Sequence, residues 1–353
     1  MSAADHRLQQ SDVVHIVGQG LAGSVLALRL IADGYRVHVH DDGHSTSSSM
    51  VAAGMWNPLS FVNLKVVARA PEMLDCMSRI YPEFERMLGI SCYHPMPLVR
   101  IFPDAGSANS WEERAESPAL RPYMDMEGST AISDTFNVPH GVGHVRHAGW
   151  LDLPLLLDNA KSFIAKQGQY TEHSITREEI GQLLDQGDWV IQCTGWRLTG
   201  DDFGDDLPLR ANKGQLYTLH IEGLDESFMS NFGRFTIPLG EGKFRVGSTY
   251  EHYPKDALPS SFAVEILADT SEALSKPFQV IDHKAGFRPT TSDRSPMLGF
   301  HPVHKRLGIF TGFGSRGVMA VPYCTQQLLN HWTEGAQLPF EIDWKRFEAR
   351  KKG

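Results

Sequence analysis

The chain has 353 residues, enough for two domains, and its 41% hydrophobic and 21% charged residues are ordinary for a globular protein. The formal net charge of −9 disfavours a protein whose main task is gripping a nucleic-acid backbone, because such proteins rely on Lys and Arg. Residues 1–12 lack the apolar core of a signal peptide and no apolar run is long enough to cross a bilayer, so the sequence predicts a cytoplasmic protein without a membrane span.

The first elements form a strand, a glycine-rich turn, a helix and a second strand. The apolar run 13–17 leads into Gly18–Gly23, the following helix ends at Gly34, and the strand over 37–41 ends in Asp41. Glycines at this spacing let the main chain approach a pyrophosphate at a helix N-terminus, and an acid about 20 residues further on accepts hydrogen bonds from a ribose. The pattern predicts a site for an adenine dinucleotide and leaves NAD and FAD both open.

The next stretch, from Asp42 to Ser49, has the composition of a flexible linker. It leads directly into the apolar, small-residue segment 50–59, which a disordered linker rarely does. We therefore interpret its hydroxyl groups as ligands or helix caps, and Ala52–Gly54 as a surface for close approach.

The segment from 71 to 147 changes near residue 90 from a helical pattern to short extended runs. Residues 71–90 have helical apolar spacing, which Pro82 is expected to break, and 90–146 contains short extended runs cut by Pro and Gly. The histidines at 140, 144 and 147 have no carboxylate or cysteine at a supporting interval, so no metal site is predicted. The four cysteines lack metal-site spacing and are expected to be buried, reduced thiols.

The middle of the chain alternates helix and strand. Residues 151–167 predict a helix with one apolar face, and 189–195 a buried strand that ends at Thr194 and Gly195. The segments 216–220, 234–238 and 243–249 have β-type composition, with a hairpin turn at 240–242, and 262–274 predicts a helix.

Two motifs stand near the carboxyl end. Residues 285–299 predict a rigid loop framed by Gly and Pro, in which the planar guanidinium of Arg288 could hold a carboxylate. Residues 307–319 run from a strand through a glycine-rich turn into a helix, whose N-terminus would face an electron-rich group. The cofactor domain is thus predicted to be discontinuous, with a β-rich domain inserted twice.

These residues resemble the D-amino acid oxidase and glycine oxidase family of FAD-dependent amine oxidases. The resemblance rests on Gly18–Gly23 with Asp41, on Ser47–Trp56 and on Gly286–Pro289. The stretches 209–215, 290–299 and 312–317 are similar to the oxidase domain of the bifunctional bacterial enzyme that trims carboxymethylaminomethyl-uridine in tRNA. The resemblance extends over nearly the whole chain.

The resemblance implies a mixed α/β fold, with a Rossmann-like FAD-binding domain and an inserted antiparallel-sheet substrate domain. The FAD-binding domain would span about 11–70, 148–215 and 286–345, and the substrate domain about 71–147 and 216–285. The cofactor-binding residues that it implies are Gly18, Gly20, Leu21, Ala22, Gly23, Asp41, Asp42, Ser48, Ser49, Ala53, Gly54, Met55, Thr194, Gly195, Gly314, Ser315, Arg316, Gly317 and Val318.

The resemblance also implies catalytic residues. Arg288 would clamp the carboxylate of the substrate, and Arg316 belongs to the turn beside the flavin. Several relatives place a tyrosine over the substrate where this chain has Phe235, which cannot hydrogen-bond a carboxylate, so Tyr250 is a candidate substitute. The cysteine to which some relatives attach their flavin is missing near Arg288, which implies noncovalent FAD.

The leading hypothesis is an oxidase of a small amine or amino acid that carries a carboxylate. Hydride would pass from carbon to flavin N5, the imine would hydrolyse, and dioxygen would yield hydrogen peroxide. The alternatives are oxidative trimming of a modified tRNA uridine, and a non-catalytic flavin-binding protein. The sequence leaves substrate stereochemistry and homo-oligomerisation open.

Overall fold

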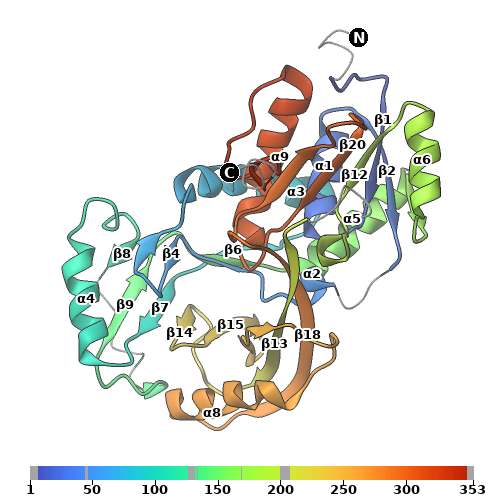
Figure 1. The fold of residues 1–353 in the computed structure, drawn as a ribbon. Coiled ribbons are helices and arrows are strands. Elements are labelled where there is room, and N and C mark those ends of the chain that lie inside the picture. Colours follow the sequence, from blue (N-terminus) through green and yellow to red (C-terminus); the bar gives the residue numbers. More distant parts are fainter. Residues whose placement is uncertain are drawn as a thin grey trace.

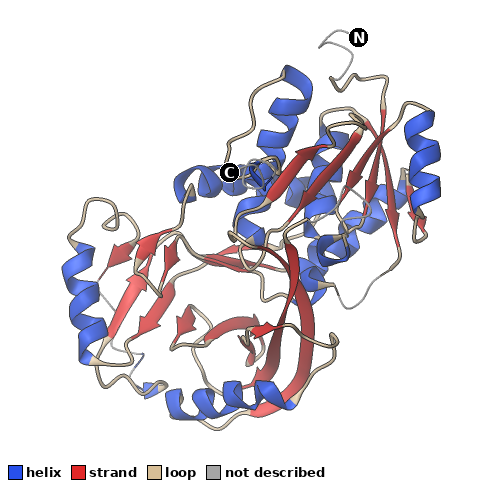
Figure 2. Cartoon of the chain, in the orientation of Figure 1, coloured by secondary structure: helices blue, strands red, loops and turns tan. Residues whose placement is uncertain are grey.

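The computed structural model describes residues 7–43, 47–125, 132, 134–167, 169–198 and 207–347. Two bodies lie side by side in Figure 1, one built on a sheet covered by helices and the other on a larger, more open sheet. Figure 2 shows that most of the helices belong to the first body and most of the strands to the second. Ser45 and Thr46, two of the hydroxyl residues predicted to be ligands or caps, lie outside the described residues.

The first body is organised on a six-stranded sheet. Its strand order is β11-β2-β1-β12-β20-β19, and all neighbours are parallel except β19, which runs antiparallel to β20. The strands are β1 (Val13–Val17), β2 (Arg36–Asp41), β11 (Tyr170–Glu172), β12 (Trp189–Gln192), β19 (Met297–Phe300) and β20 (Leu307–Thr311). Such a parallel sheet needs both faces covered, which explains its apolar strands.

Helices cover both faces of this sheet. They are α1 (Leu21–Ala32), α3 (Ala70–Leu88), α5 (Leu153–Lys166), α6 (Arg177–Asp185) and α9 (Gly317–Leu329). All but α6 share one apolar core with strand residues such as Ile16 and Val39, whereas Ile180 of α6 packs with Val17 and Val190 on the opposite face. The predicted strand–helix–strand opening and the mixed α/β fold are confirmed.

Helix α3 shows that the predicted break at Pro82 was wrong. It continues through Pro82 without a break, since Ile80, Tyr81 and Phe84 around the proline are buried in the core of the first body. That packing offsets the hydrogen bond that a proline removes from a helix. The helix thus packs with the six-stranded sheet, although the sequence places residue 71 onward in the substrate domain.

The second body is organised on a nine-stranded sheet of order β17-β13-β16-β15-β14-β7-β9-β8, with β18 also paired to β13. Its strands are β7 (Leu98–Ile101), β8 (Met124–Asp125), β9 (Val142–Val145), β13 (Leu209–His220), β14 (Met229–Asn231), β15 (Phe235–Gly240), β16 (Lys243–Gly247), β17 (Glu251–His252) and β18 (Gln279–Thr291). Helix α8 (Val264–Ala273) packs on the outer end of this body (Figure 1).

The long antiparallel pair β13 and β18 connects the two bodies. The pair spans the second body and ends beside the first, where Thr290 bridges to Phe313 after β20. Arg288 therefore lies within a strand rather than in the loop that the sequence predicted. The Gly and Pro around it did not prevent pairing, because the opposite strand β13 continues along the same length.

Smaller elements complete the chain. They are α2 (Ser48–Val51), β3 (Met55–Trp56), β4 (Leu59–Ser60), β5 (Lys65–Val66), β6 (Tyr93–Pro95), α4 (Ala105–Ala115), β10 (Gly149–Leu151), the 3₁₀ turns Gly195–Arg197 and Ser261–Ala263, and the π-helical turn Asn330–Glu334. Helix α4 was missed where only extended runs were predicted, because Trp111 is its one buried residue and so it lacks apolar periodicity. Asp104 caps it by accepting from the Ser107 N–H.

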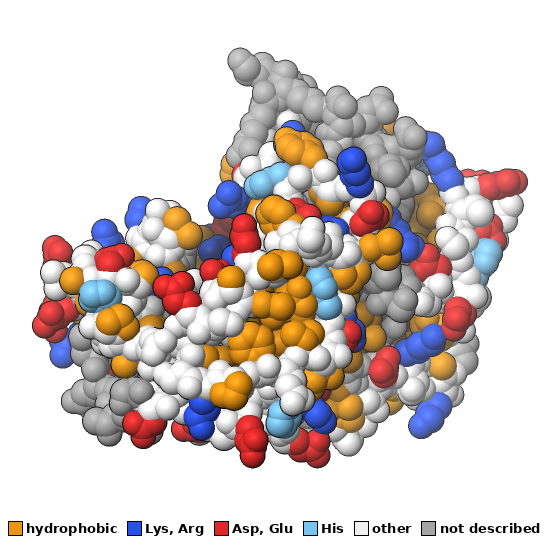
Figure 3. Space-filling view, turned by 90° about the horizontal axis from the view of Figure 1, so that it is seen from below, with side chains coloured by type: hydrophobic (Ala, Val, Ile, Leu, Met, Phe, Trp, Pro, Cys, Tyr) orange, Lys and Arg blue, Asp and Glu red, His pale blue; other side chains and the backbone are white. Residues whose placement is uncertain are grey.

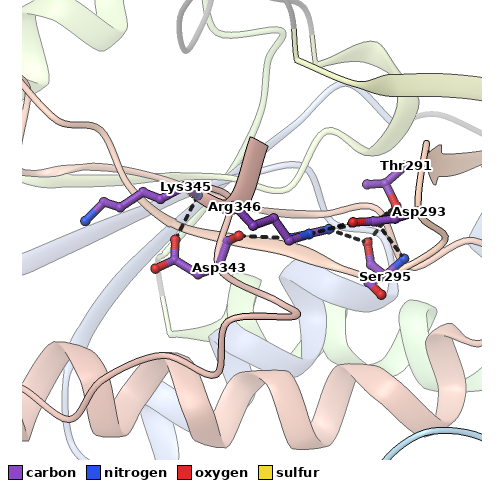
Figure 4. A network of polar contacts seen from close by, with 6 residues as sticks. All are labelled: Thr291, Asp293, Ser295, Asp343, Lys345 and Arg346. Atoms are coloured by element: carbon purple, nitrogen blue, oxygen red, sulfur yellow. Dashed lines mark hydrogen bonds and ion pairs between the residues drawn. The ribbon is translucent and has the colours of Figure 1, made fainter. Parts of the chain in front are cut away.

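The C-terminal segment is fixed by a buried ion pair. Arg346 is 1% exposed, and its Nε lies 2.9 Å from Oδ2 of Asp293 in the turn between β18 and β19 (Figure 4). The same guanidinium donates to the carbonyls of Asp343 and Ser295. The end of the chain is thereby tied to the strand that carries Arg288.

The surface carries mixed charge. On the face in Figure 3, acidic and basic side chains are interspersed around a central group of hydrophobic ones. None of the helices in the described part is long and apolar enough to span a membrane. All four cysteines are buried and outside disulfides, as the sequence predicted.

Candidate active site

A cavity of about 800 Å³ lies between the two bodies and is lined by both. It brings together most of the residues singled out in the sequence, although they come from segments up to hundreds of positions apart. The predicted residues that line it are Gly18, Gly20, Leu21, Ala22, Asp41, Asp42, Ser48, Ser49, Ala53, Gly54, Met55, Thr194, Gly195, Phe235, Arg288, Gly314, Ser315, Arg316, Gly317 and Val318. Two other predicted residues, Gly23 and Tyr250, lie outside this lining.

The glycines of the first turn are required by close main-chain contacts. A Cβ on Gly23 would lie 1.9 Å from the carbonyl oxygen of Gly18, and one on Gly18 would lie 2.8 Å from that of Cys193. Gly18 also has a φ of +98°. Gly23 thus acts by packing α1 onto the turn, while Gly18 and Gly20 face the cavity.

The N-terminus of α1 opens into the cavity. Its N-cap residue, Gly20, has no capping side chain, and the N–H of Leu21 donates to Oγ of Ser49 at 2.9 Å. The unsatisfied N–H groups and the helix dipole favour an anion here. Ser47 caps the short helix α2 that presents Ser49, so the predicted capping role of these hydroxyls is confirmed for Ser47.

Asp41 lies at the end of β2 and is buried. Its Oδ1 accepts from the N–H of Gln19 at 2.8 Å, and its Oδ2 accepts from the N–H of Gly43 at 2.9 Å. Burial and the charge of Asp41 raise the pKa of Tyr170 to about 12. The neighbouring Asp42 forms an ion pair with Arg197.

The segment after α2 is held against the cavity by main-chain contacts. A Cβ on Gly54 would lie 2.1 Å from the carbonyl oxygen of Leu151, so only glycine fits. The guanidinium of Arg245 donates to the carbonyls of Ala52 and Ala53 at 3.3 and 3.2 Å. Burial lowers the pKa of Arg245, against the opposing charge of Asp152.

The second glycine-rich turn, 312–317, leads into α9. Its N-cap residue, Arg316, has no capping hydrogen bond, and the buried hydroxyl of Tyr81 in α3 donates to the carbonyl of Val318 at 2.6 Å. Burial, followed by the charge of Arg294, lowers the pKa of Arg316. A second helix N-terminus therefore faces the same cavity.

Arg288 crosses β13 toward the end of β16. Its Nη1 donates to Oδ1 of Asn212 at 3.3 Å and to the Thr249 carbonyl at 3.1 Å, and its Nη2 donates to Oγ of Ser248 at 3.0 Å. A Cβ on Gly214 would lie 2.0 Å from Nη2, so this glycine provides the space that the guanidinium occupies.

The Arg288 guanidinium lacks a carboxylate partner within the part of the chain that the structure describes. Burial lowers its pKa, and Tyr250 opposes this effect. A partly buried cation whose hydrogen bonds go to neutral oxygens can receive an anion from the cavity.

The two aromatic candidates are placed differently. Phe235 lines the cavity, with its ring against Gly247 on the neighbouring strand. Tyr250 is 43% exposed and lies outside the cavity lining; its ring centre is 5.6 Å from Cζ of Arg288. It is thus in position to stack on the arginine rather than to reach into the cavity.

The sequence reasoning missed Arg100 and Arg245. Arg100 lines the cavity from β7, and Arg245 orders the Ala52–Ala53 segment from β16. Each is a lone arginine between two buried apolar residues of a short strand, as in Val99-Arg100-Ile101. That alternation points the side chain away from the core and was the available signal.

Three histidines of β1 and β2 lie close together. The ring nitrogens of His15, His38 and His40 that could ligate an ion lie within 4.8 Å of one another, and Nδ1 of His15 is 2.9 Å from Nε2 of His40. The rings are stacked, with 11° between the planes of His38 and His40. The in-plane lone pairs of stacked rings run side by side, so they do not converge on one point as the ligands of a metal ion do.

Burial, together with the neighbouring histidines, lowers the pKa of His40 to about 4. Within the described ranges, His140, His144 and His147 belong to no comparable cluster.

The chain is similar in sequence to curated enzymes. It is 26% identical to the glycine oxidase of Pseudomonas putida over 93% of this chain and 96% of that protein. It is 23% identical to the tRNA 5-methylaminomethyl-2-thiouridine biosynthesis bifunctional protein of an Azoarcus species over 93% of this chain, but spans only 58% of that protein.

Solved structures share the fold. The glycine oxidase of Geobacillus kaustophilus superposes with a TM-score of 0.73 at 18% identity, covering 93% of this chain and 96% of that one. The iminodiacetate oxidase of a Chelativorans species gives a TM-score of 0.74 at 19% identity, covering 93% and 97%.

The cavity meets the structural demands of a long dinucleotide. Gly18, Gly20 and Gly54 line it, two helix N-termini face inward, and the buried Oγ1 of Thr194 has no hydrogen-bond partner among the described residues. The family described as FAD dependent oxidoreductase matches residues 13–329, a span that contains all of these features. The chain therefore belongs to the FAD dependent oxidoreductase family.

Proposed function

We propose that this oxidoreductase oxidises a small amine or amino acid that carries a carboxylate. Its FAD-binding domain would comprise about 11–70, 148–215 and 286–345 together with helix α3, and its substrate domain the rest of 71–147 and 216–285. Strands β13 and β18 cross the boundaries at 215 and 286, since both pair along their length in the nine-stranded sheet. The similarity to glycine oxidase over almost the full length of both chains supports this reaction class.

Noncovalent FAD would be held by main-chain groups and hydroxyls. Gly18, Gly20 and Leu21 would face the pyrophosphate and Asp41 the ribose, while Ser48 to Met55 and Gly314 to Val318 would lie along the rest of the cofactor. Cys193 is the cysteine in the cavity lining, and its burial raises the pKa of the thiol so far that it stays neutral. A neutral, buried thiol is a poor nucleophile, which supports noncovalent binding.

The observation that carries the proposal is the partly buried guanidinium of Arg288 in the cavity wall, beside the second glycine turn. Its hydrogen bonds to Asn212, Thr249 and Ser248 go to neutral oxygens, so a substrate carboxylate would supply a balancing negative charge. Its planar fork would fix the carboxylate, and with it the orientation of the neighbouring carbon.

FAD, when bound, supplies the two-electron acceptor for the bond between carbon and hydrogen next to the nitrogen. The chain's own task is positioning and exclusion of water. Among the described residues that line the cavity from the second body, Arg100 and Arg288 are the titratable ones. None of these described residues could act there as a general base near neutral pH. The substrate would therefore react as the neutral amine, with Phe235 closing off solvent.

The net reaction balances as amine, dioxygen and water giving a carbonyl compound, hydrogen peroxide and ammonia or a primary amine. We further propose that the protein acts in the cytoplasm and that dioxygen reoxidises the cofactor.

A peroxide-coupled screen tests this function. Holoenzyme would be offered D- and L-amino acids, glycine, sarcosine and other N-alkyl glycines. Arg288→Ala should raise KM for the best substrate on the order of 100-fold, since a buried charge-assisted pair is lost, while flavin content stays the same. An unchanged KM would refute the carboxylate clamp. Failure of every amine to bleach the flavin anaerobically would favour a non-catalytic flavin protein.

Trimming of a modified tRNA uridine is the second candidate. The similarity to the Azoarcus protein favours it, although this chain spans just over half of that protein's length. The net charge of −9 weighs against a phosphate-backbone partner. Retention of holoenzyme on immobilised tRNA at moderate salt would support this candidate, and passage through the column would oppose it.

A further inference from the structure

The main chain between β16 and β17 holds the guanidinium of Arg288. Both strands pair with β13, and the connecting residues 248–250 are one more than the stretch of β13 that they face, so they form a bulge, here called the seat. Two acceptors of the guanidinium belong to the seat, Oγ of Ser248 at 3.0 Å and the carbonyl of Thr249 at 3.1 Å. The position of the guanidinium therefore depends on how the seat is fixed.

Gln215 of β13 fixes the seat with its main chain and its side chain, and it is fully buried. Its N–H donates to Oγ1 of Thr249 at 2.9 Å, and its carbonyl accepts from the N–H of Thr249 at 3.1 Å. Its Nε2 donates to the carboxylate of Glu251 at 2.5 Å and to Oγ of Ser260 at 2.8 Å, and its Oε1 accepts from the N–H of Ser260 at 2.7 Å. Every polar group of Gln215 thus holds the one segment 249–260.

The side chain of Gln215 lies on the face of β13 opposite to the Arg288 guanidinium. A Cβ on Gly214 would lie 2.0 Å from Nη2 of Arg288, so the guanidinium covers the face to which Gly214 points. Successive residues of a strand point to opposite faces, which places the Gln215 amide behind the sheet. Gln215 borders the cavity, but both atoms of its amide are engaged by Glu251 and Ser260. The amide therefore acts on the Arg288 site through the seat and not on the substrate directly.

We propose that Gln215 is a positioning residue that fixes Arg288 for binding the substrate carboxylate. This inference rests on the proposed amine oxidation, since it concerns the carboxylate clamp of the same site. Removing the amide leaves the N–H of Ser260 without its acceptor, and the seat loses the contacts that hold it from behind. The neutral oxygens that orient the guanidinium move with the seat, so the carboxylate meets a displaced partner.

A double-mutant cycle tests this role. Holoenzyme with Gln215→Met, with Arg288→Met and with both changes would be compared in kcat/KM for the best carboxylate substrate. Gln215→Met alone should lower kcat/KM about 10-fold, mainly through KM, with flavin content unchanged. In the Arg288→Met background the same change should have less than about a twofold effect, because no guanidinium remains to be positioned. Losses that multiply would overturn the proposal and assign Gln215 a general structural role.

Thr236→Val is the matched control in the same sheet. It removes one member of a buried hydroxyl pair, in which Oγ of Ser230 and Oγ1 of Thr236 lie 2.7 Å apart. It should lower Tm and leave KM unchanged, since it does not touch the seat. If Gln215→Met does not fold, the milder Ser260→Ala decides, because it removes one partner of the amide. It should raise KM about threefold, and an unchanged KM would overturn the proposal.

Ligand binding separates this proposal from the reaction itself. Propionate and its neutral counterpart propionamide would be titrated into holoenzyme and followed by the flavin absorbance spectrum. Gln215→Met should weaken propionate binding about tenfold and leave propionamide within about twofold, because only the carboxylate depends on Arg288. This readout remains valid if no amine is oxidised, an outcome that would refute the proposed function alone. Equal weakening of the two ligands would overturn the positioning role of Gln215.

Discussion

Gly214 provides a sharp test of how the fold positions Arg288. In Gly214→Ala the added Cβ would lie 2.0 Å from Nη2, 2.3 Å from Cζ and 2.6 Å from Nη1 of Arg288. Ordinary contact begins at 3.4 Å, so the guanidinium must retreat by more than 1 Å. Misplacing a positioning group by 1 Å costs about 100-fold in rate. We therefore expect kcat/KM for the best carboxylate substrate to fall on the order of 100-fold.

Folding should be spared, because the clashing atoms belong to the end of a flexible side chain and Gly214 lies in β13 outside the left-handed region. The free energy of unfolding should stay within about 1 kcal/mol of wild type. The assay combines steady-state peroxide kinetics with urea unfolding and flavin content.

The matched control is Gly181→Ala in α6, where no atom lies within 4 Å of the added Cβ. It should stabilise the protein by about 0.5–1 kcal/mol and leave the kinetics unchanged. A KM for Gly214→Ala within twofold of wild type would refute the reasoning, since the carboxylate would then bind without the observed position of Arg288.

Three other predictions concern stability and the cofactor turn. Burial and nearby histidines lower the pKa of His40 from 6.5 to about 4, so between these pH values the unfolded chain binds a proton that the folded chain does not. The free energy of unfolding should therefore be highest above pH 6.5 and should fall as the pH drops toward 4. The loss is on the order of 1 kcal/mol after solvent screening, and His40→Gln should flatten the plot of Tm against pH; an unchanged slope would contradict this origin. Arg346→Met should cost about 3 kcal/mol in urea unfolding, because it leaves the Asp293 carboxylate without its buried partner, whereas Arg79→Met should cost less than about 1 kcal/mol. Gly23→Ala should abolish flavin binding or folding, since its Cβ meets rigid main chain rather than a side chain; stoichiometric flavin in the purified variant would oppose this.

The local sequence determined those elements that depend on interactions between residues close together in the chain. The strand, glycine turn and helix of 13–32 follow from a β-branched run, positive φ and close packing at glycine, and apolar periodicity, which act over a few residues. The same holds for the second turn and α9. The family resemblance added the reaction class, which composition alone could not reach.

Where local and tertiary effects compete, the sequence misled. Pro82 is a helix breaker in isolation, but burial of Tyr81 and Phe84 keeps α3 continuous. Helix α4 was not predicted because Trp111 is its one buried residue, which leaves no apolar periodicity in the sequence. Arg288 looked like a loop residue because its neighbours are Gly and Pro, yet β13 supplies a strand partner over its whole length.

The cavity was decided by tertiary structure alone. Arg100, Phe235 and Arg288 stand on three strands that come together only through the register of the nine-stranded sheet, and no sequence interval encodes that register. The opening turn from Gly18 was readable because its chemistry lies within six residues. The positions of the two arginines depend on strand pairing over nearly 200 residues, which the physics of neighbouring residues does not determine.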